Sequence, residues 1–173
     1  MVKRILTIVF SFLLLCSCNY YTNNFGYVRK KNKINFKPVS LTDIDSNSFY
    51  KLINIQYLKI DYEVKEEKKL NEYLKFYSNN KIALFKILNS ANNEIDPSKA
   101  YMGYYYLKNN LINIDFYKNH IQSGNYSVNY IIIDIKKDTI IIETEGKAMS
   151  KSSRKTYLKQ SINSIYKIKQ PDW

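Results

Sequence analysis

The stretch AYMGYYYLKNNLINIDFY, residues 100–117, predicts a β-hairpin and decides the fold class. Two runs rich in tyrosine and β-branched residues flank Asn109 and Asn110. Asparagine tolerates the positive φ that a two-residue type I′ turn requires. With these two residues as the turn, Gly103 lies opposite Phe116 on an apolar face, where the glycine leaves room for the larger side chain.

The same arrangement of strands around a short polar turn occurs twice more along the chain. Residues 73–88 (YLKFYSNNKIALFKIL) predict a hairpin with its turn at residues 79–80. Residues 130–145 (YIIIDIKKDTIIIETE) predict another hairpin, with its turn at residues 137–138. Three hairpins in one short chain indicate a β-meander.

Three further segments extend this meander at its ends. Residues 49–56 alternate well enough for a first strand, and residues 154–160 and 162–169 predict one or two closing strands. The chain therefore has about eight strands in sequence order, the number that closes a small up-and-down barrel around side chains or one ligand. We expect an all-β antiparallel barrel.

Closure of the meander predicts which side chains fill the barrel. The side chains expected inside are those of Phe76, Phe85, Tyr105, Leu107, Ile112, Ile114, Phe116, Ile131, Ile133 and Ile142. Most of these are large, which favours a packed interior. Gly103 and Ala83 are the small exceptions, and they predict a shallow apolar ligand site beside them at the barrel mouth. That site would be lined by Phe85, Tyr105 and Phe116.

The N-terminus has the pattern of a targeting segment. Residues 1–17 hold a short basic start and an apolar run that is too short to span a bilayer. The run LCSC at residues 15–18 resembles a bacterial lipoprotein signal, which implies cleavage before Cys18 and acylation of that residue. An ordinary secreted protein cut nearby, or a cytosolic protein with an apolar N-terminus, is the alternative.

Three regions follow from this pattern: a lipoprotein signal at 1–17, a lipidated N-terminus with a flexible basic linker at 18–37, and a β-barrel domain at 38–173. Four basic residues of the linker are expected either to rest on anionic headgroups or to be solvated: Arg29, Lys30, Lys31 and Lys33. No acidic cluster follows Cys18. In the lipoproteins that this signal resembles, such a cluster often directs transport to the cell surface. We therefore expect an outer-membrane anchor that faces the periplasm.

Charge and cysteine content exclude several classes of protein. The net charge is +12, yet only three of the 27 basic residues are arginines and no nucleic-acid motif is present. Both cysteines lie in the N-terminal segment, so we expect no disulfide in the folded domain. We also expect the protein to be a monomer. The membrane is the expected partner, together with a small apolar ligand or an envelope protein.

Catalytic and metal templates find little support. The single histidine, His120, falls in a connector, and no cofactor motif or metal cluster is present. Asp134 and Glu143 share a face of the last hairpin at a spacing that a glycosidase pair tolerates, but strand alternation explains both as solvent-facing. Three tyrosines on one sheet face invite a carbohydrate-stacking interpretation: Tyr104, Tyr106 and Tyr117. We expect no enzyme.

A family resemblance rests on several short motifs spread over residues 44–145. They are Ile44, Asp45, Ser46, Asn47 and Tyr50, then YLKFYSNNK from Tyr73, then Gly103, Tyr104 and Tyr105, then Asp138, Thr139 and Ile140. These residues resemble a set of uncharacterised flavobacterial-type lipoproteins. The resemblance implies a lipocalin-like barrel and a cell-envelope location. The expected function is a non-catalytic binding module for an apolar or amphipathic small molecule, or alternatively an accessory protein with a packed barrel.

Overall fold

The regular structure of the described part of the chain consists almost entirely of β-strands. The computed structural model describes residues 20–30, 39, 44–58, 71–86, 94–120, 124–144, 152–161, 167–169, 171 and 173. Among these residues one 3-10 turn, η1 (Pro97–Lys99), interrupts the strands. Strands outside the barrel are β1 (Tyr20–Thr22), β2 (Val28–Lys30), β6 (Glu94–Ile95) and β12 (Lys167–Ile168).

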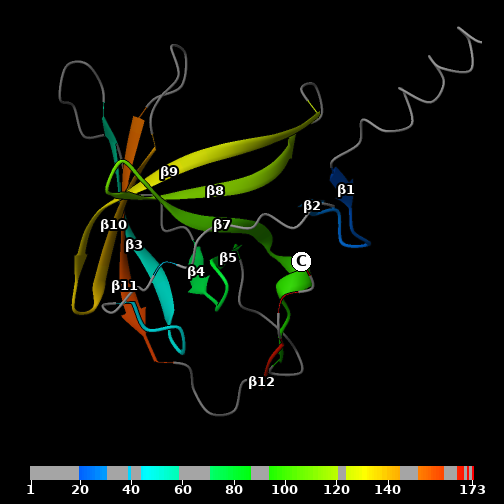
Figure 1. Cartoon of the computed structure of the whole chain (residues 1–173). Coiled ribbons are helices and arrows are strands. Elements are labelled where there is room, and N and C mark those ends of the chain that lie inside the picture. The colour runs from blue at the N-terminus through cyan, green and yellow to red at the C-terminus, as the bar shows by residue number, and fades with distance from the viewer. Residues whose placement is uncertain are drawn as a thin grey trace, which may run out of the picture.

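Eight strands form a closed barrel in which each strand pairs antiparallel with the next one along the chain (Figure 1). They are β3 (Phe49–Leu58), β4 (Tyr73–Phe76), β5 (Lys81–Phe85), β7 (Tyr101–Lys108), β8 (Leu111–His120), β9 (Gly124–Lys136), β10 (Thr139–Thr144) and β11 (Ser152–Gln160). Strand β11 pairs back onto β3 and closes the barrel. The predicted all-β, up-and-down barrel is confirmed.

The hairpin of β7 and β8 has the predicted register. Gly103 lies opposite Phe116. Asn109 and Asn110 form the turn with φ values of 51° and 60°, the left-handed conformation that a type I′ turn needs.

The hairpin of β4 and β5 has a longer turn than predicted. The amide of Tyr77 donates to the carbonyl of Lys81 over 2.9 Å, so three residues, 78–80, form the loop instead of two. One extra residue shifts the register by one and turns every side chain of β5 to the other face. Ala83 and Phe85 therefore lie on the outside of the barrel, and their predicted inward orientation was wrong.

Bulges change the predicted orientation in two further strands. In β9 the register shifts at Ile133, which is 41% exposed, so Tyr130 and Ile132 point inward where Ile131 and Ile133 were predicted to do so. In β3 the register shifts at Ile53, which is 52% exposed. Both bulges bend a long strand around the barrel while its apolar positions stay inside.

The barrel interior is a packed apolar core. Its buried members are Ile44, Tyr50, Leu52, Ile55, Leu74, Phe76, Ile82, Leu84, Tyr105, Ile114, Phe116, Tyr130, Ile132, Ile140, Ile142 and Tyr157. Of the predicted inward residues, Ile112 packs against this core, whereas Leu107 is 58% exposed because it lies beside a turn. Large side chains thus fill most of the barrel, as the sequence predicts.

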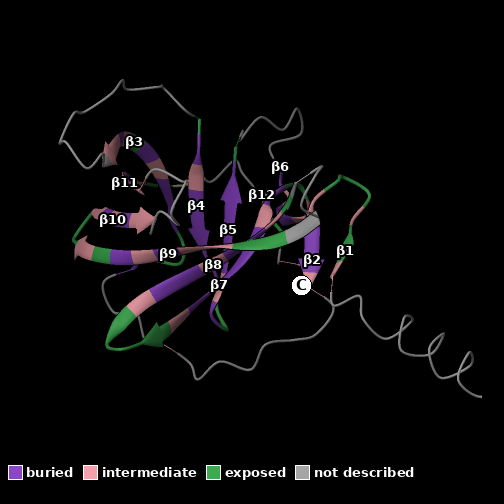
Figure 2. Ribbon diagram, turned by 90° about the horizontal axis from the view of Figure 1, so that it is seen from above, coloured by how far each residue is buried: buried purple, intermediate pink, exposed green. Residues whose placement is uncertain are grey.

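A second apolar cluster lies on the outside of the barrel, where β1 and β2 pack beside β7 and β8 (Figure 2). Residues 20–30 form this hairpin, so the prediction of a flexible linker was wrong for them. The ring of Tyr20 lies 5.6 Å from the ring of Tyr117. Tyr117 and Tyr104 are buried in this cluster, together with Met102 and Trp173.

Arg29 joins the N-terminal hairpin to two other parts of the chain and is fully buried. Its guanidinium donates to the carbonyls of Pro97 at 3.0 Å, Ser98 at 2.8 Å and Ala100 at 3.0 Å. The same guanidinium lies 4.6 Å above the ring of Trp173. We call Arg29, these three carbonyls and Trp173 the clasp.

The predicted closing segment at 162–169 does not add a strand to the barrel in its described part. Only residues 167–169 of it are described, and β12 pairs in parallel with β6 outside the barrel. Strand β11 alone closes the barrel against β3.

Candidate functional site

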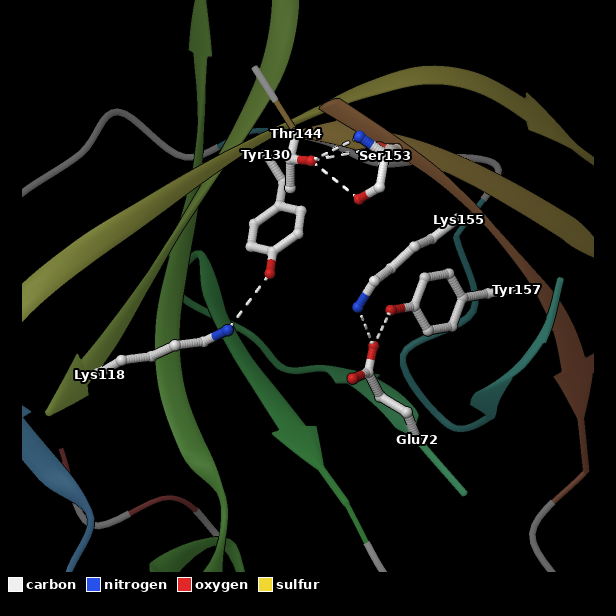
Figure 3. A network of polar contacts seen from close by, with 7 residues as sticks. All are labelled: Glu72, Lys118, Tyr130, Thr144, Ser153, Lys155 and Tyr157. Atoms are coloured by element: carbon white, nitrogen blue, oxygen red, sulfur yellow. Dashed lines mark hydrogen bonds and ion pairs between the residues drawn. The ribbon is translucent and has the colours of Figure 1, made fainter. Parts of the chain in front are cut away.

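The two ends of the barrel differ in the side chains that point inward. At the turn end, which holds the loops at 78–80, 109–110 and 137–138, apolar side chains such as Phe76 and Tyr105 fill the interior. The open end is the opposite one, where β3, β5, β8 and β10 finish. Charged and hydroxyl groups reach inward there from four elements (Figure 3). We call these residues the mouth cluster: Glu72, Lys118, Tyr130, Lys155 and Tyr157.

A buried carboxylate holds one side of the mouth cluster. Glu72 is 7% exposed and directly precedes β4. Its Oε1 atom accepts from Lys155 Nζ at 2.7 Å and from the Tyr157 hydroxyl at 2.5 Å. Figure 3 shows both donors of β11 converging on this carboxylate. Because the ammonium and the hydroxyl both donate to Glu72, the negative charge is fully compensated within the barrel.

The other side of the mouth cluster presents a cation without a carboxylate partner in the described residues. Lys118 Nζ donates to the Tyr130 hydroxyl over 3.3 Å (Figure 3). It also lies over two aromatic rings, 5.6 Å from the centroid of Tyr101 and 5.8 Å from that of Tyr130. The flanking rings offer an apolar wall beside the ammonium group.

Burial makes this cation unusual. Desolvation is the main reason why the pKa of Lys118 falls to about 8, and the positive charges of Lys155 and Lys86 lower it further. Glu72 opposes them in part. Burial also raises the pKa of the Tyr130 hydroxyl, which therefore stays protonated at neutral pH. Lys118 donates to that oxygen, so the hydroxyl proton of Tyr130 is available for another acceptor.

The charges around the mouth do not balance within the described part of the chain. Lys86 directly follows β5, with its ammonium 5.7 Å from the centroid of the Tyr101 ring. Among the described residues of this end, the ammonium groups of Lys86, Lys118 and Lys155 thus face one carboxylate, that of Glu72. An anion at this end would relieve the repulsion among the lysines and accept hydrogen bonds from Lys118 and Tyr130.

The predicted ligand site beside Gly103 has no free volume among the described residues. A Cβ atom on Gly103 would lie 2.7 Å from Phe116 Cδ1, 2.7 Å from the carbonyl oxygen of Asp115 and 3.0 Å from Ile82. Tyr105 and Phe116 line the interior as predicted, whereas Ala83 and Phe85 lie outside it. The structure therefore brings together only three of the five predicted lining residues, and it packs them tightly.

The other candidate residues have structural partners. Asp134 pairs with Lys136 at 3.2 Å, and Glu143 pairs with Arg154 at 2.5 Å, so each carboxylate is neutralised by its own neighbour.

The predicted aromatic face is not an open stacking platform. Tyr104 and Tyr117 are buried beneath the N-terminal hairpin, and Tyr106 donates to Asp115 over 3.1 Å. Cys18 and the side chain of His120 are not among the parts of the chain that the structure describes.

The mouth cluster was missed because its members read as ordinary solvent-facing charges. A signal was nevertheless present in the period-2 pattern. Ile114 and Phe116 point inward, so the next inward position of β8 is Lys118. By the same alternation, Tyr157 of β11 points inward and Lys155 is the next inward position toward the open end. Charged residues that continue an inward-facing series mark the polar end of a barrel interior.

Comparison of the chain with family models, with curated proteins and with solved structures finds no match. Within the described residues, no helix has the length and apolar character that a membrane span requires. Nor do the described residues contain a group of His, Cys, Asp or Glu side chains arranged to hold a metal ion.

Proposed function

We propose that this protein is a lipoprotein anchored through Cys18 to the outer membrane, and that its barrel binds a small amphipathic anion at the open end. The observation that carries the ligand proposal is Lys118, a desolvated cation beside two further lysines with no carboxylate partner in the described part of the chain. The run LCSC at residues 15–18 supports the anchor. The barrel acts as a non-catalytic binding module that faces the periplasm.

The packed core limits where a ligand sits. Large side chains fill the turn end, and Phe116 with Ile82 occupies the space above Gly103. An apolar tail therefore lies at the mouth, against Tyr101 and Val128, which pack on the core while remaining partly exposed. In this proposal the anionic head of the ligand contacts Lys118 and its apolar part lies along the adjoining rim.

A carboxylate is the head group that best fits these donors. The ammonium of Lys118 and the hydroxyl of Tyr130 are close enough to address the two oxygens of one carboxylate. A charge-assisted hydrogen bond contributes about 1.5–3 kcal/mol, more than a neutral one. Because the pKa of Lys118 is about 8, the group is largely protonated at neutral pH and able to bind an anion.

The packed interior also favours the second candidate, an envelope accessory protein whose barrel holds no ligand. Under that interpretation Lys118 and Lys155 are structural features of the open end. The two candidates differ in one measurable property, which is affinity for an amphipathic acid.

Dansyl-labelled undecanoic acid is expected to bind the barrel, and Lys118→Met is expected to weaken this binding by about tenfold to a hundredfold. The loss follows from removal of one charge-assisted hydrogen bond without a large change in side-chain volume. Fluorescence titration measures it on a chain that begins at Asn19 and so keeps every described residue.

Two comparisons separate a head-group effect from a general loss of binding. Lys108→Met, at the turn end, is expected to leave the affinity unchanged, and the methyl ester of the probe is expected to bind no better to the parent than to Lys118→Met. Affinity for the acid should also fall as pH rises above about 8, where free Lys118 loses its proton. Equal affinity of the parent for acid and ester would contradict the proposal and favour the packed accessory protein.

Cys18→Ala is expected to abolish lipid attachment and release the protein from membranes. The expected diacylglycerol and N-acyl chains each contribute about 0.8 kcal/mol per buried methylene, which makes the anchor effectively permanent. Expression in a bacterium with a labelled fatty acid measures this. A label that persists in Cys18→Ala would rule out this residue as the attachment site.

A further inference from the structure

The position of the N-terminal hairpin sets the distance between the barrel and the anchor. Strand β1 begins at Tyr20, two residues after Cys18. Two residues span at most about 7 Å. A lipid on Cys18 therefore holds β1 at the membrane surface, with no linker of twenty residues between the anchor and the folded protein.

The hairpin is fixed to the barrel and cannot act as a loose tether. Through Arg29 the clasp binds it to three carbonyls and to the ring of Trp173. Asn23 adds a hydrogen bond of 2.6 Å from its side-chain nitrogen to the carbonyl of Ser98. The side of the barrel that carries the hairpin consequently stays close to the bilayer.

Exposed side chains of the hairpin are suited to a membrane interface. Phe25 is 52% exposed at the tip and Tyr21 is 42% exposed on β1. Lys99 is exposed beside them, with its ammonium 5.1 Å from the Phe25 ring. Aromatic rings favour the headgroup level of a bilayer, and residues 20–30 contain no Asp or Glu. We call Tyr21, Phe25 and Lys99 the docking surface.

The docking surface adjoins the open end of the barrel. Tyr27 of the hairpin packs edge-on against Tyr101, with ring centroids 5.1 Å apart. Tyr101 is the ring over which Lys118 and Lys86 lie. The same aromatic pair thus connects the hairpin with the mouth cluster, and Figure 1 shows the hairpin on the side where β7 begins.

We propose that the docking surface inserts its aromatic side chains into the headgroup layer of an anionic bilayer and holds the open end of the barrel against that bilayer. The proposal relies on the anchor at Cys18 but not on ligand binding. Lys99, which is exposed beside the Phe25 ring, supplies attraction to anionic lipid at up to about 1 kcal/mol. The occupant of the docking surface is therefore the lipid surface to which the chain itself is attached, not a second protein.

Quenching by brominated lipids tests this contact directly. The full lipidated protein is reconstituted in phosphatidylglycerol-containing vesicles whose acyl chains carry bromine. In the Phe25→Trp variant, the added tryptophan emission is expected to be largely lost and shifted to shorter wavelength. Trp173 serves as an internal reference, because it is buried and 7% exposed in the parent protein.

Leu107→Trp is the matched control, because Leu107 is 58% exposed at the turn end. Its emission is expected to persist. Lys99→Glu in the Phe25→Trp background is expected to reduce quenching on anionic vesicles and to have little effect on phosphatidylcholine vesicles.

Every other outcome overturns part or all of the proposal. Protein that does not float with vesicles overturns both the anchor and the docking surface. Floating protein without quenching at position 25 overturns the docking surface alone, and equal quenching at both positions overturns the orientation of the barrel. The titration with the dansyl acid is carried out without membranes. It therefore tests ligand binding independently of these three outcomes of the vesicle experiment.

Discussion

Arg29→Met is expected to lower the free energy of unfolding by about 3 kcal/mol or more, because three carbonyl groups lose their charged donor at once. Arg29 is fully buried, and its guanidinium donates to Pro97, Ser98 and Ala100 while it covers Trp173. Methionine fills part of the volume but donates no hydrogen bond. Urea denaturation followed by circular dichroism measures the change.

Two variants show whether the loss comes from the clasp. Arg154→Met removes an arginine whose side chain is 42% exposed and paired with Glu143, so it is expected to cost less than about 1 kcal/mol. Arg29→Lys keeps the charge but lacks the planar guanidinium with its several donors. Its loss of unfolding free energy is expected to lie between those of Arg29→Met and Arg154→Met.

Proteolysis offers a second measure if Arg29→Met folds poorly. Loosening of the hairpin is expected to expose Tyr20 and Tyr27, which pack against Tyr117 and Tyr101, to chymotrypsin before the barrel strands are cut. Unchanged denaturation together with unchanged cleavage would show that the clasp contributes nothing to stability.

Gly103→Ala is expected to lower the free energy of unfolding by about 3 kcal/mol through overpacking. The new methyl group would lie 2.7 Å from Phe116 Cδ1 and 2.7 Å from the carbonyl oxygen of Asp115. The Phe116 ring is packed against other core residues, and the Asp115 carbonyl belongs to the backbone of β8. Neither group can therefore move far enough to make room for the methyl group. Thermal and urea denaturation of the purified protein measure the effect.

Gly26→Ala is the control for this prediction. Gly26 has a φ of +80° but nothing within 4 Å of a built Cβ, so its replacement adds backbone strain of about 1 kcal/mol without a clash. Phe116→Leu in the Gly103→Ala background is expected to recover part of the loss. Equal destabilisation by Gly103→Ala and Gly26→Ala would show that the contact with Phe116 is not limiting.

The order and number of barrel strands were predictable from local sequence, because each strand alternates in polarity and each turn carries its own chemistry. Asn109 and Asn110 adopt the predicted left-handed turn, and the register of β7 and β8 followed from it. The loop at 78–80 has one residue more than a type I′ turn, and no local signal distinguishes the two lengths in YSNNK. Because the prediction left out this one residue, it assigned Ala83 and Phe85 to the wrong face of the sheet.

Bulges and outer contacts depend on distant parts of the chain and were not predictable. Ile133 is an ordinary strand residue in sequence, and only closure of the barrel makes the bulge necessary. Arg29 was expected to rest on anionic headgroups or to be solvated, and both expectations were wrong because it is fully buried. Its partners are backbone carbonyls, which carry no sequence signature. The mouth cluster also joins the residue before β4 with residues of β8, β9 and β11, which no single stretch of sequence brings together.

The clasp has a consequence for the order in which the protein folds. Arg29 and Trp173 are separated by 144 positions (173 − 29), whereas the hairpins close over a few residues. Contacts between such distant positions incur a larger loop-closure entropy than local ones and form more slowly. We therefore expect the N-terminal hairpin to reach its final position last, after the barrel has closed.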